Sequence, residues 1–299
     1  MKANAFLRLL VGWLYLTMLN PGPGHADETH FTAHDVLNGV APGDCQGSNY
    51  IRVALDGRED CLRFYGAQAE PTNRPPLVFL EGDVISVAQP RTYPPAWQVG
   101  EFYRRLNPKL MQKEADLYSA ATARTFVNLA RPGTFGSSGH HLERRRPREV
   151  ALVNAALDAL KARFGWAQIN LAGFSGGGHL VGALLARRDD IGCAVIASGN
   201  VAVRQRGVER GLSADVTGYE DFVDPIEHAA EIGRRPPMRV VILTDPADRI
   251  VEAKFQNMFA VALRTAGVAV EQRLVAAADP DHHNLRSAAI IAGLACADR

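Results

Sequence analysis

Short apolar runs alternate with segments of helical periodicity along most of this chain. The runs expected to form buried strands are Leu77 to Leu80, Thr125 to Leu129, a run beginning at Gln168, Ala194 to Ala197, Val240 to Leu243 and Val268 to Val275. Helices are expected at about Val99 to Tyr118, Pro147 to Phe164, Ala253 to Ala266 and Leu285 to Ala295. Buried strands that alternate with helices are typical of a mostly parallel sheet covered on both faces. The pattern therefore predicts an α/β domain.

Three segments depart from this alternation. Residues Tyr50 to Leu55 and Leu62 to Tyr65 alternate apolar and polar side chains around Asp56-Gly57, which predicts a hairpin. Two irregular excursions, at about 84–123 and 201–235, leave the sheet pattern. They either wall a substrate site or cover the sheet. Their aromatic residues, which are consistent with an apolar wall, are Tyr93, Trp97, Phe102 and Tyr219.

The first 26 residues resemble an export signal. Lys2 and Arg8 precede an apolar run, Leu9 to Leu19, that is too short for a membrane span. Small residues then lead to Ala26, where we expect cleavage. Residues 27–299 would then form a single periplasmic or secreted domain, without a stable membrane anchor. An uncleaved anchor is the alternative.

The composition favours one globular domain. The chain has 299 residues, of which 47% are hydrophobic and 22% charged, and its net charge is +1. This charge gives no reason to expect a nucleic-acid partner, and the oligomeric state stays open. The basic run Arg144-Arg145-Arg146-Pro147-Arg148 is short, and we interpret it as a solvated loop before a helix.

Four cysteines in an exported chain favour disulfides. We expect Cys45 to pair with Cys61, and Cys193, near the start of a core strand, to pair with Cys296 at the end of the last helix. The sequence contains no C-x-x-C spacing, and we expect no metal site. We also expect no cofactor.

The segment Gln168 to Leu180 carries the main chemical signal. Gly173-Phe174-Ser175-Gly176-Gly177 fits the G-x-S-x-G pattern, with a strand before it and a helix after it. A serine on such a sharp turn stands clear of the backbone, beside a base and backbone N–H donors. A glycine-rich turn that serves packing alone is the alternative.

Acid and base candidates follow at the ends of later strands. Asp245 and Asp248 come after the strand Val240 to Leu243, and His282 and His283 come before the last helix. Ligands of doubly wound sheets lie at the carboxyl ends of the strands, so these residues are expected near Ser175. The order Ser, Asp, His is the one that the elbow requires. Taken singly, an aspartate or histidine here also suits a helix cap.

These residues carry a resemblance to a known family. From Asp224 onwards the chain is similar to prolyl-oligopeptidase-like and dienelactone-hydrolase-like catalytic domains. The matching residues are Asp224-Pro225-Ile226-Glu227-His228, Asp248 with Val251, Leu263, Gly267 and His283 with Leu285. The resemblance implies an α/β-hydrolase fold with a mostly parallel sheet of about eight strands. It also implies that Asp248 rather than Asp245 is the acid and that His283 rather than His282 is the base.

In this family two backbone N–H groups bind the oxyanion of the reaction. The matching donors here are Gly176, directly after the nucleophile, and Asp83, in the loop after Leu80. The sequence departs from the family at this loop, where Glu81-Gly82-Asp83 replaces the usual His-Gly. Two carboxylates so close to an oxyanion would repel it unless they point away or are paired.

The sequence thus predicts an exported serine hydrolase that cleaves a carboxylic ester through a Ser175, Asp248, His283 triad and an acyl-enzyme. Its partner would be a small-molecule or peptide acyl substrate. A serine peptidase of prolyl-oligopeptidase type is one alternative. A non-catalytic binding protein that kept the fold is the other, with Glu81-Gly82-Asp83 as a disabled oxyanion hole.

Overall fold

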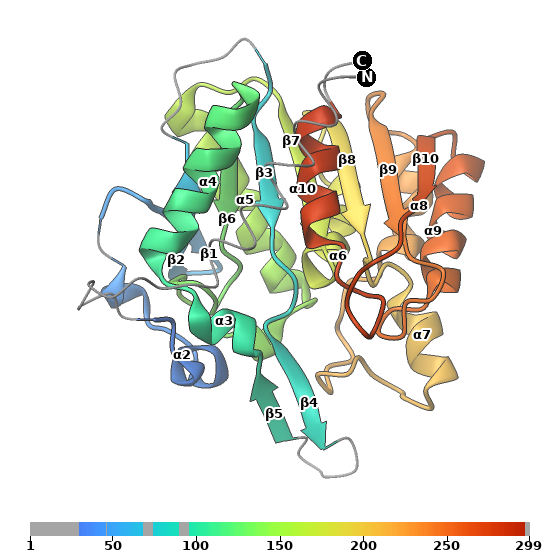
Figure 1. The fold of residues 1–299 in the computed structure, drawn as a ribbon, viewed down its shortest axis with the longest axis horizontal. Coiled ribbons are helices and arrows are strands. Elements are labelled where there is room, and N and C mark those ends of the chain that lie inside the picture. Colours follow the sequence, from blue (N-terminus) through green and yellow to red (C-terminus); the bar gives the residue numbers. More distant parts are fainter. Residues whose placement is uncertain (1–29, 46, 68–73, 90–95, 297–299) are drawn as a thin grey trace.

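A computed structural model of the chain describes residues 30–45, 47–67, 74–89 and 96–296. The proposed signal segment and Tyr93 lie outside these ranges. Eight strands form one sheet in the order β1-β2-β6-β3-β7-β8-β9-β10 (Figure 1). Their bounds are Tyr50–Leu55 for β1, Arg58–Gly66 for β2, Leu77–Leu80 for β3, Phe126–Leu129 for β6, Ile169–Phe174 for β7, Ile191–Ala197 for β8, Arg239–Thr244 for β9 and Ala269–Leu274 for β10.

Strand direction divides the sheet into two parts. β1 pairs with β2 and β2 with β6 in antiparallel fashion, whereas every pair from β6 to β10 is parallel. The predicted hairpin and the mostly parallel sheet are thus confirmed, and the architecture is the α/β-hydrolase fold. The carboxyl ends of β3, β7, β8 and β9 meet at one edge, which is where the sequence places its candidate site residues.

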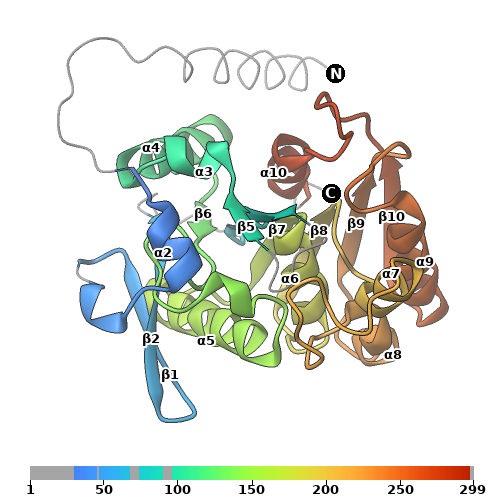
Figure 2. The ribbon, with the colours of Figure 1, turned by 90° about the horizontal axis from the view of Figure 1, so that it is seen from below.

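Helices cover both faces of the sheet (Figure 2). One face carries α5, α6 and α9, and the other carries α4 and α10. The helix bounds are Ala33–Asn38 for α2, Glu101–Arg105 for α3, Pro108–Thr122 for α4, Pro147–Phe164 for α5, Gly176–Leu185 for α6, Val203–Glu209 for α7, Ala229–Ile232 for α8, Ala253–Thr265 for α9 and Arg286–Ala295 for α10, with short 3-10 turns at Pro42–Asp44, His141–Glu143 and Pro225–His228. No helix in the described part of the chain is long and apolar enough to cross a membrane.

Each face of the sheet has its own apolar core. On the α5 and α6 side, Val153, Leu157 and Leu180 pack against the strands, and all three are fully buried. On the other side, Phe79 and Ile290 belong to a second buried cluster. Because both faces of the sheet are covered here, β3 is continuously apolar, as the sequence pattern predicted. β7 is apolar except for Asn170, whose side-chain oxygen accepts a 3.0 Å bond from the Cys193 N–H.

The first excursion differs from the prediction. A two-stranded sheet of β4 (Ile85–Gln89) and β5 (Ala96–Val99) opens the excursion, and two helices, α3 and α4, replace the single helix expected over about 99–118. The helix breaks at Asn107, whose side chain accepts a 2.8 Å hydrogen bond from the Leu110 N–H, while Pro108 occupies the first turn of α4. The local capping signal Asn-Pro thus overrides the helical spacing.

Two disulfides tie distant segments together. Cys45 is bonded to Cys61 and Cys193 to Cys296, with sequence separations of 16 and 103 residues. This is the pairing that the sequence predicted. The second bond joins β8 to the end of α10, the helix that follows the candidate base His283.

Candidate active site

Ser175 lies on a sharp turn between β7 and α6. Its backbone adopts φ 52° and ψ −115°, a conformation that side-chain-bearing residues seldom take. The turn is tight: a Cβ on Gly173 would lie 2.3 Å from the Gly177 carbonyl oxygen, and a Cβ on Gly177 would lie 2.0 Å from the Leu80 carbonyl oxygen. Both positions therefore require glycine, and the hydroxyl projects from a rigid elbow.

The structure brings Ser175, His283 and Asp248 together. His283 Nε2 lies 2.9 Å from Ser175 Oγ, and His283 Nδ1 lies 2.9 and 3.0 Å from the two carboxylate oxygens of Asp248. The Asp248 side chain is fully buried and that of His283 is 12% exposed. These contacts form a continuous hydrogen-bonded chain from Ser175 through His283 to Asp248, and the Asp248 end of the chain is buried.

Loop hydrogen bonds hold the acid and the base in place. Asp248 Oδ1 accepts from the backbone N–H groups of Ile250 and Val251 at 2.9 and 2.8 Å, which fixes its carboxylate after β9. The His283 carbonyl accepts a 2.8 Å bond from the Ser198 hydroxyl at the end of β8. Asp248 thus orders its own turn and faces the imidazole with the same carboxylate.

The other acid and base candidates pair with each other. Asp245 Oδ2 lies 3.2 Å from His282 Nδ1 and accepts a 2.7 Å bond from the Ala277 N–H. His282 is the more exposed histidine, with 40% of its side chain accessible. Of the two pairs, only Asp248 and His283 reach Ser175.

The loop after β3 lies directly against the elbow. A Cβ on Gly82 would approach the Phe174 ring to 3.0 Å and Ser175 Cβ to 3.3 Å. Gly176, the other expected donor, is the first residue of α6. Among the described residues no hydrogen-bond acceptor faces the Asp83 N–H. The Asp83 N–H is therefore available in the loop whose Gly82 packs on Ser175.

The Glu81 carboxylate is buried and paired. Arg286, in the first turn of α10, donates to it through Nε at 3.0 Å, and Asn128 Nδ2 donates at 2.9 Å. Arg286 also donates to Glu114 at 2.7 Å. Burial alone would lower the pKa of Arg286, but Glu114 and Glu81 raise it well above its ordinary value. Glu81 therefore links the loop after β3 to the helix after His283.

The Asp83 carboxylate is paired with three arginines. Arg131 Nη1 lies 2.7 Å from one oxygen, and Arg144 Nε and Arg145 Nη1 lie 3.0 and 2.6 Å from the other. Burial would raise the pKa of Asp83, but Arg145, Arg131 and Arg144 together hold it well below its ordinary value. The repulsion expected from the two acidic side chains of this loop is thus offset by pairing.

The prediction of a solvated basic loop is wrong for Arg144 and Arg145. Both side chains are only 2% exposed. Arg145 also forms a pair with Asp215 at 2.9 Å, and Arg144 stacks 4.8 Å from the centre of the Trp97 ring. The local sequence does not reveal this cluster, because the acids that pair with these arginines lie about 60 to 70 residues away in the chain.

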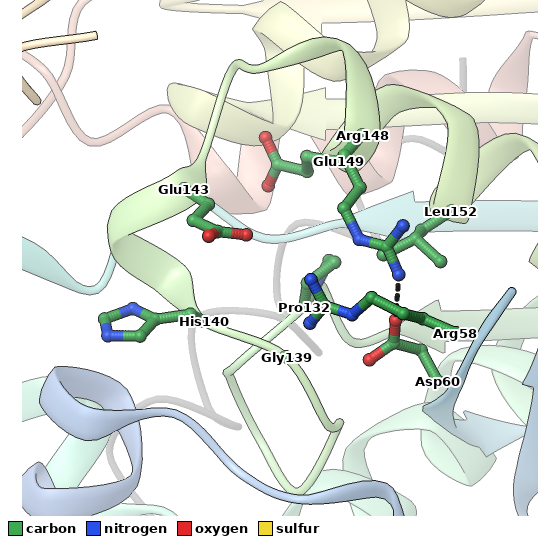
Figure 3. Close-up of a pocket in the computed structure, with 9 residues that line it drawn as sticks. All are labelled: Arg58, Asp60, Pro132, Gly139, His140, Glu143, Arg148, Glu149 and Leu152. Carbon is green, nitrogen blue, oxygen red and sulfur yellow. Dashed lines mark hydrogen bonds and ion pairs between the residues drawn. The ribbon is translucent and has the colours of Figure 1, made fainter. Parts of the chain in front are cut away.

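A separate hollow lies beside the start of α5 (Figure 3). It is lined by Arg58, Asp60, Pro132, Gly139, His140, Glu143, Arg148, Glu149 and Leu152. Its acids are already engaged: Arg148 Nη2 binds Asp60 at 2.6 Å, and Glu149 accepts bonds from Arg131 at 2.8 and 2.9 Å. The hollow contains none of the triad residues. Within the described residues, no group of three or more His, Cys, Asp and Glu side chains is placed to hold a metal ion.

Neither the protein-family models nor the curated proteins compared with this sequence gave a match. Solved structures are similar in fold. An acylaminoacyl peptidase of Pyrococcus horikoshii superposes with a TM-score of 0.54 at 12% identity, over 83% of this chain but only 39% of the peptidase. The Pyrococcus furiosus esterase Pf2001 has a TM-score of 0.53 at 12% identity, over 90% of both chains. Est1E from Butyrivibrio proteoclasticus has a TM-score of 0.51 at 12% identity, over 83% of this chain and 96% of Est1E.

Proposed function

We propose that this protein is a serine hydrolase that cleaves carboxylic esters through an acyl-enzyme. The observation that carries the proposal is the hydrogen-bonded chain from Ser175 through His283 to Asp248 on a strained elbow. Serine is a weak nucleophile without such a base, and the three residue types in this contact order form a complete set for acyl transfer.

Each group has one role in the proposed reaction. His283 Nε2 accepts the proton of Ser175 as Oγ attacks the acyl carbonyl, and it then returns the proton to the leaving alcohol. Asp248 holds the imidazole in the tautomer with a proton on Nδ1 and stabilises the imidazolium that forms. The N–H groups of Gly176 and Asp83 bind the oxyanion. Water activated by the same histidine then releases the acid.

An ester is the first choice of substrate, ahead of a peptide. Pf2001, which is an esterase, matches this chain over 90% of both lengths. The acylaminoacyl peptidase is matched over only 39% of its own length, so 61% of it lies outside the match. The chain thus spans less than two fifths of that peptidase. The match to the esterase over nearly the whole of both chains favours a small-molecule ester as the substrate.

We also propose that the protein works outside the cytoplasm. The two disulfides support this location, because such bonds persist in oxidising compartments. In this proposal residues 1–26 are a cleaved signal and 27–299 are one catalytic domain. The amino-terminal sequence of protein recovered from the exported fraction tests the cleavage after Ala26.

The substrate class is tested with a panel of p-nitrophenyl esters of increasing acyl length and a set of proline-containing peptide amides. We expect ester turnover by the wild type and its loss in Ser175→Ala. Turnover of the peptide amides alone would establish the peptidase alternative. Folded wild-type protein that turns over neither set would support a non-catalytic binding protein.

A further inference from the structure

The Asp83 carboxylate is the centre of a buried ionic cluster. Arg131 and Arg145 each hold a second acid on their far side: Arg131 Nε binds Glu149 at 2.9 Å, and Arg145 Nε binds Asp215 at 2.9 Å. The two arginines are therefore anchored to α5 and to the second excursion before they reach Asp83. Each arginine is therefore held by a second carboxylate independently of Asp83.

The same carboxylate touches the backbone beside the nucleophile. A Cβ on Gly176 would lie 2.0 Å from Asp83 Oδ1 and 2.5 Å from Arg131 Nη1, so both groups pack directly on that glycine. On the other side of Asp83, the Val84 N–H donates to His141 Nε2 at 3.4 Å. The Asp83 residue is thus held by its side chain and by the peptide that follows it, while its own N–H has no acceptor among the described residues.

We propose that the Asp83 side chain is a positioning residue for the oxyanion hole. Its three arginine contacts fix the peptide unit whose N–H binds the oxyanion, and the guanidinium charges offset its own negative charge. This inference rests on the proposed hydrolase function. It also accounts for an aspartate at a position where a carboxylate would otherwise oppose the reaction.

Positioning and charge make opposite predictions for one substitution. Asp83→Asn removes a negative charge near the developing oxyanion, so an effect of charge alone would raise kcat. It also removes the charged acceptor of three arginines, so a loss of positioning lowers kcat. Arg144→Met lowers kcat in both cases. Arg144 suits this test because Asp83 is the only acid it binds among the described residues.

A matched control exists at the other end of the sheet. Asp190 precedes β8 and accepts a 2.9 Å bond from Arg188 Nε, and its side chain is 17% exposed against 20% for Asp83. It also pairs with Lys161. Asp190→Asn therefore removes a similar arginine-bound carboxylate at a distance from the proposed chemistry.

The experiment measures kcat and KM for an ester, and the inhibition constant of a trifluoromethyl ketone, which forms an oxyanion adduct with an active-site serine. We expect Asp83→Asn and Arg144→Met to lower kcat and ketone affinity in parallel by about 10- to 100-fold, less than the 10²- to 10³-fold typical of a lost donor. KM should stay within about threefold, because the Asp83 N–H bonds more strongly to the oxyanion of the transition state than to the carbonyl oxygen of the bound substrate. Asp190→Asn should stay within about twofold in all three.

An unchanged or higher kcat in Asp83→Asn, with unchanged ketone affinity, would overturn the inference. If Asp83→Asn does not fold, Arg144→Lys decides the question: it keeps the positive charge but loses the Nε contact with Asp83, so positioning predicts the same parallel loss and charge alone predicts no change. These outcomes differ from failure of the proposed function, in which the wild type itself neither turns over esters nor binds the ketone.

Discussion

The disulfide between Cys193 and Cys296 should contribute more to stability than the one between Cys45 and Cys61. In the chain-entropy description, a cross-link stabilises by restricting the unfolded chain, and the effect grows with the logarithm of the closed loop. The separations of 103 and 16 residues correspond to about 4.7 and about 3.1 kcal/mol. Removing the longer cross-link by replacing both cysteines with alanine should therefore cost about 1.6 kcal/mol more than removing the shorter one.

Urea unfolding of the wild type and the two double variants checks this difference. The free energies of unfolding in water are compared by linear extrapolation, with tryptophan fluorescence as the signal. Equal losses, or a larger loss for Cys45 and Cys61, would refute the entropic reasoning.

Three further predictions follow from the site and its surroundings. Gly177→Ala should abolish ester turnover and lower the free energy of unfolding by at least about 1 to 3 kcal/mol, because the added Cβ would lie 2.0 Å from the Leu80 carbonyl oxygen. A folded, active variant would contradict the elbow geometry. In a kinetic assay, His283→Gln should lower kcat at least about 10³-fold, whereas His282→Gln should change it by no more than about threefold. A larger loss in His282→Gln than in His283→Gln would identify His282 as the base. Burial lowers the pKa of His179 to about 4, so the unfolded chain alone binds its proton between about pH 6.5 and 4, and stability should fall as the pH drops through this window. His179→Gln should flatten that fall by up to about 3 kcal/mol in urea unfolding at pH 7 and pH 4.5, and an unchanged pH profile would contradict it.

The parts of the fold that are encoded locally were predictable. β3 and α5 begin and end where the sequence pattern placed them, because a continuous apolar run and a proline at the first helical turn are both local signals. The β4 and β5 pair was not predicted. Its strands are short, and proline-rich sequence between them gave no alternating pattern.

The surroundings of the candidate site were harder to foresee than its central residues. The elbow at Ser175 has its own motif, and the order of acid and base follows from strand ends. The pairing of Glu81 with Arg286 joins residues 205 positions apart, and no sequence spacing encodes it. From the sequence alone, the two carboxylates of Glu81-Gly82-Asp83 would oppose oxyanion binding. In the folded chain, four arginines pair with these carboxylates.

The reactivity of Ser175 tests the account most directly. Folded protein is treated with a fluorophosphonate, which bonds covalently to an activated serine, and the adduct is measured by intact mass and located by peptide mapping. The account predicts one adduct per chain, on Ser175, and none in Ser175→Ala. No adduct on folded wild-type protein, or an adduct on another serine, would contradict it.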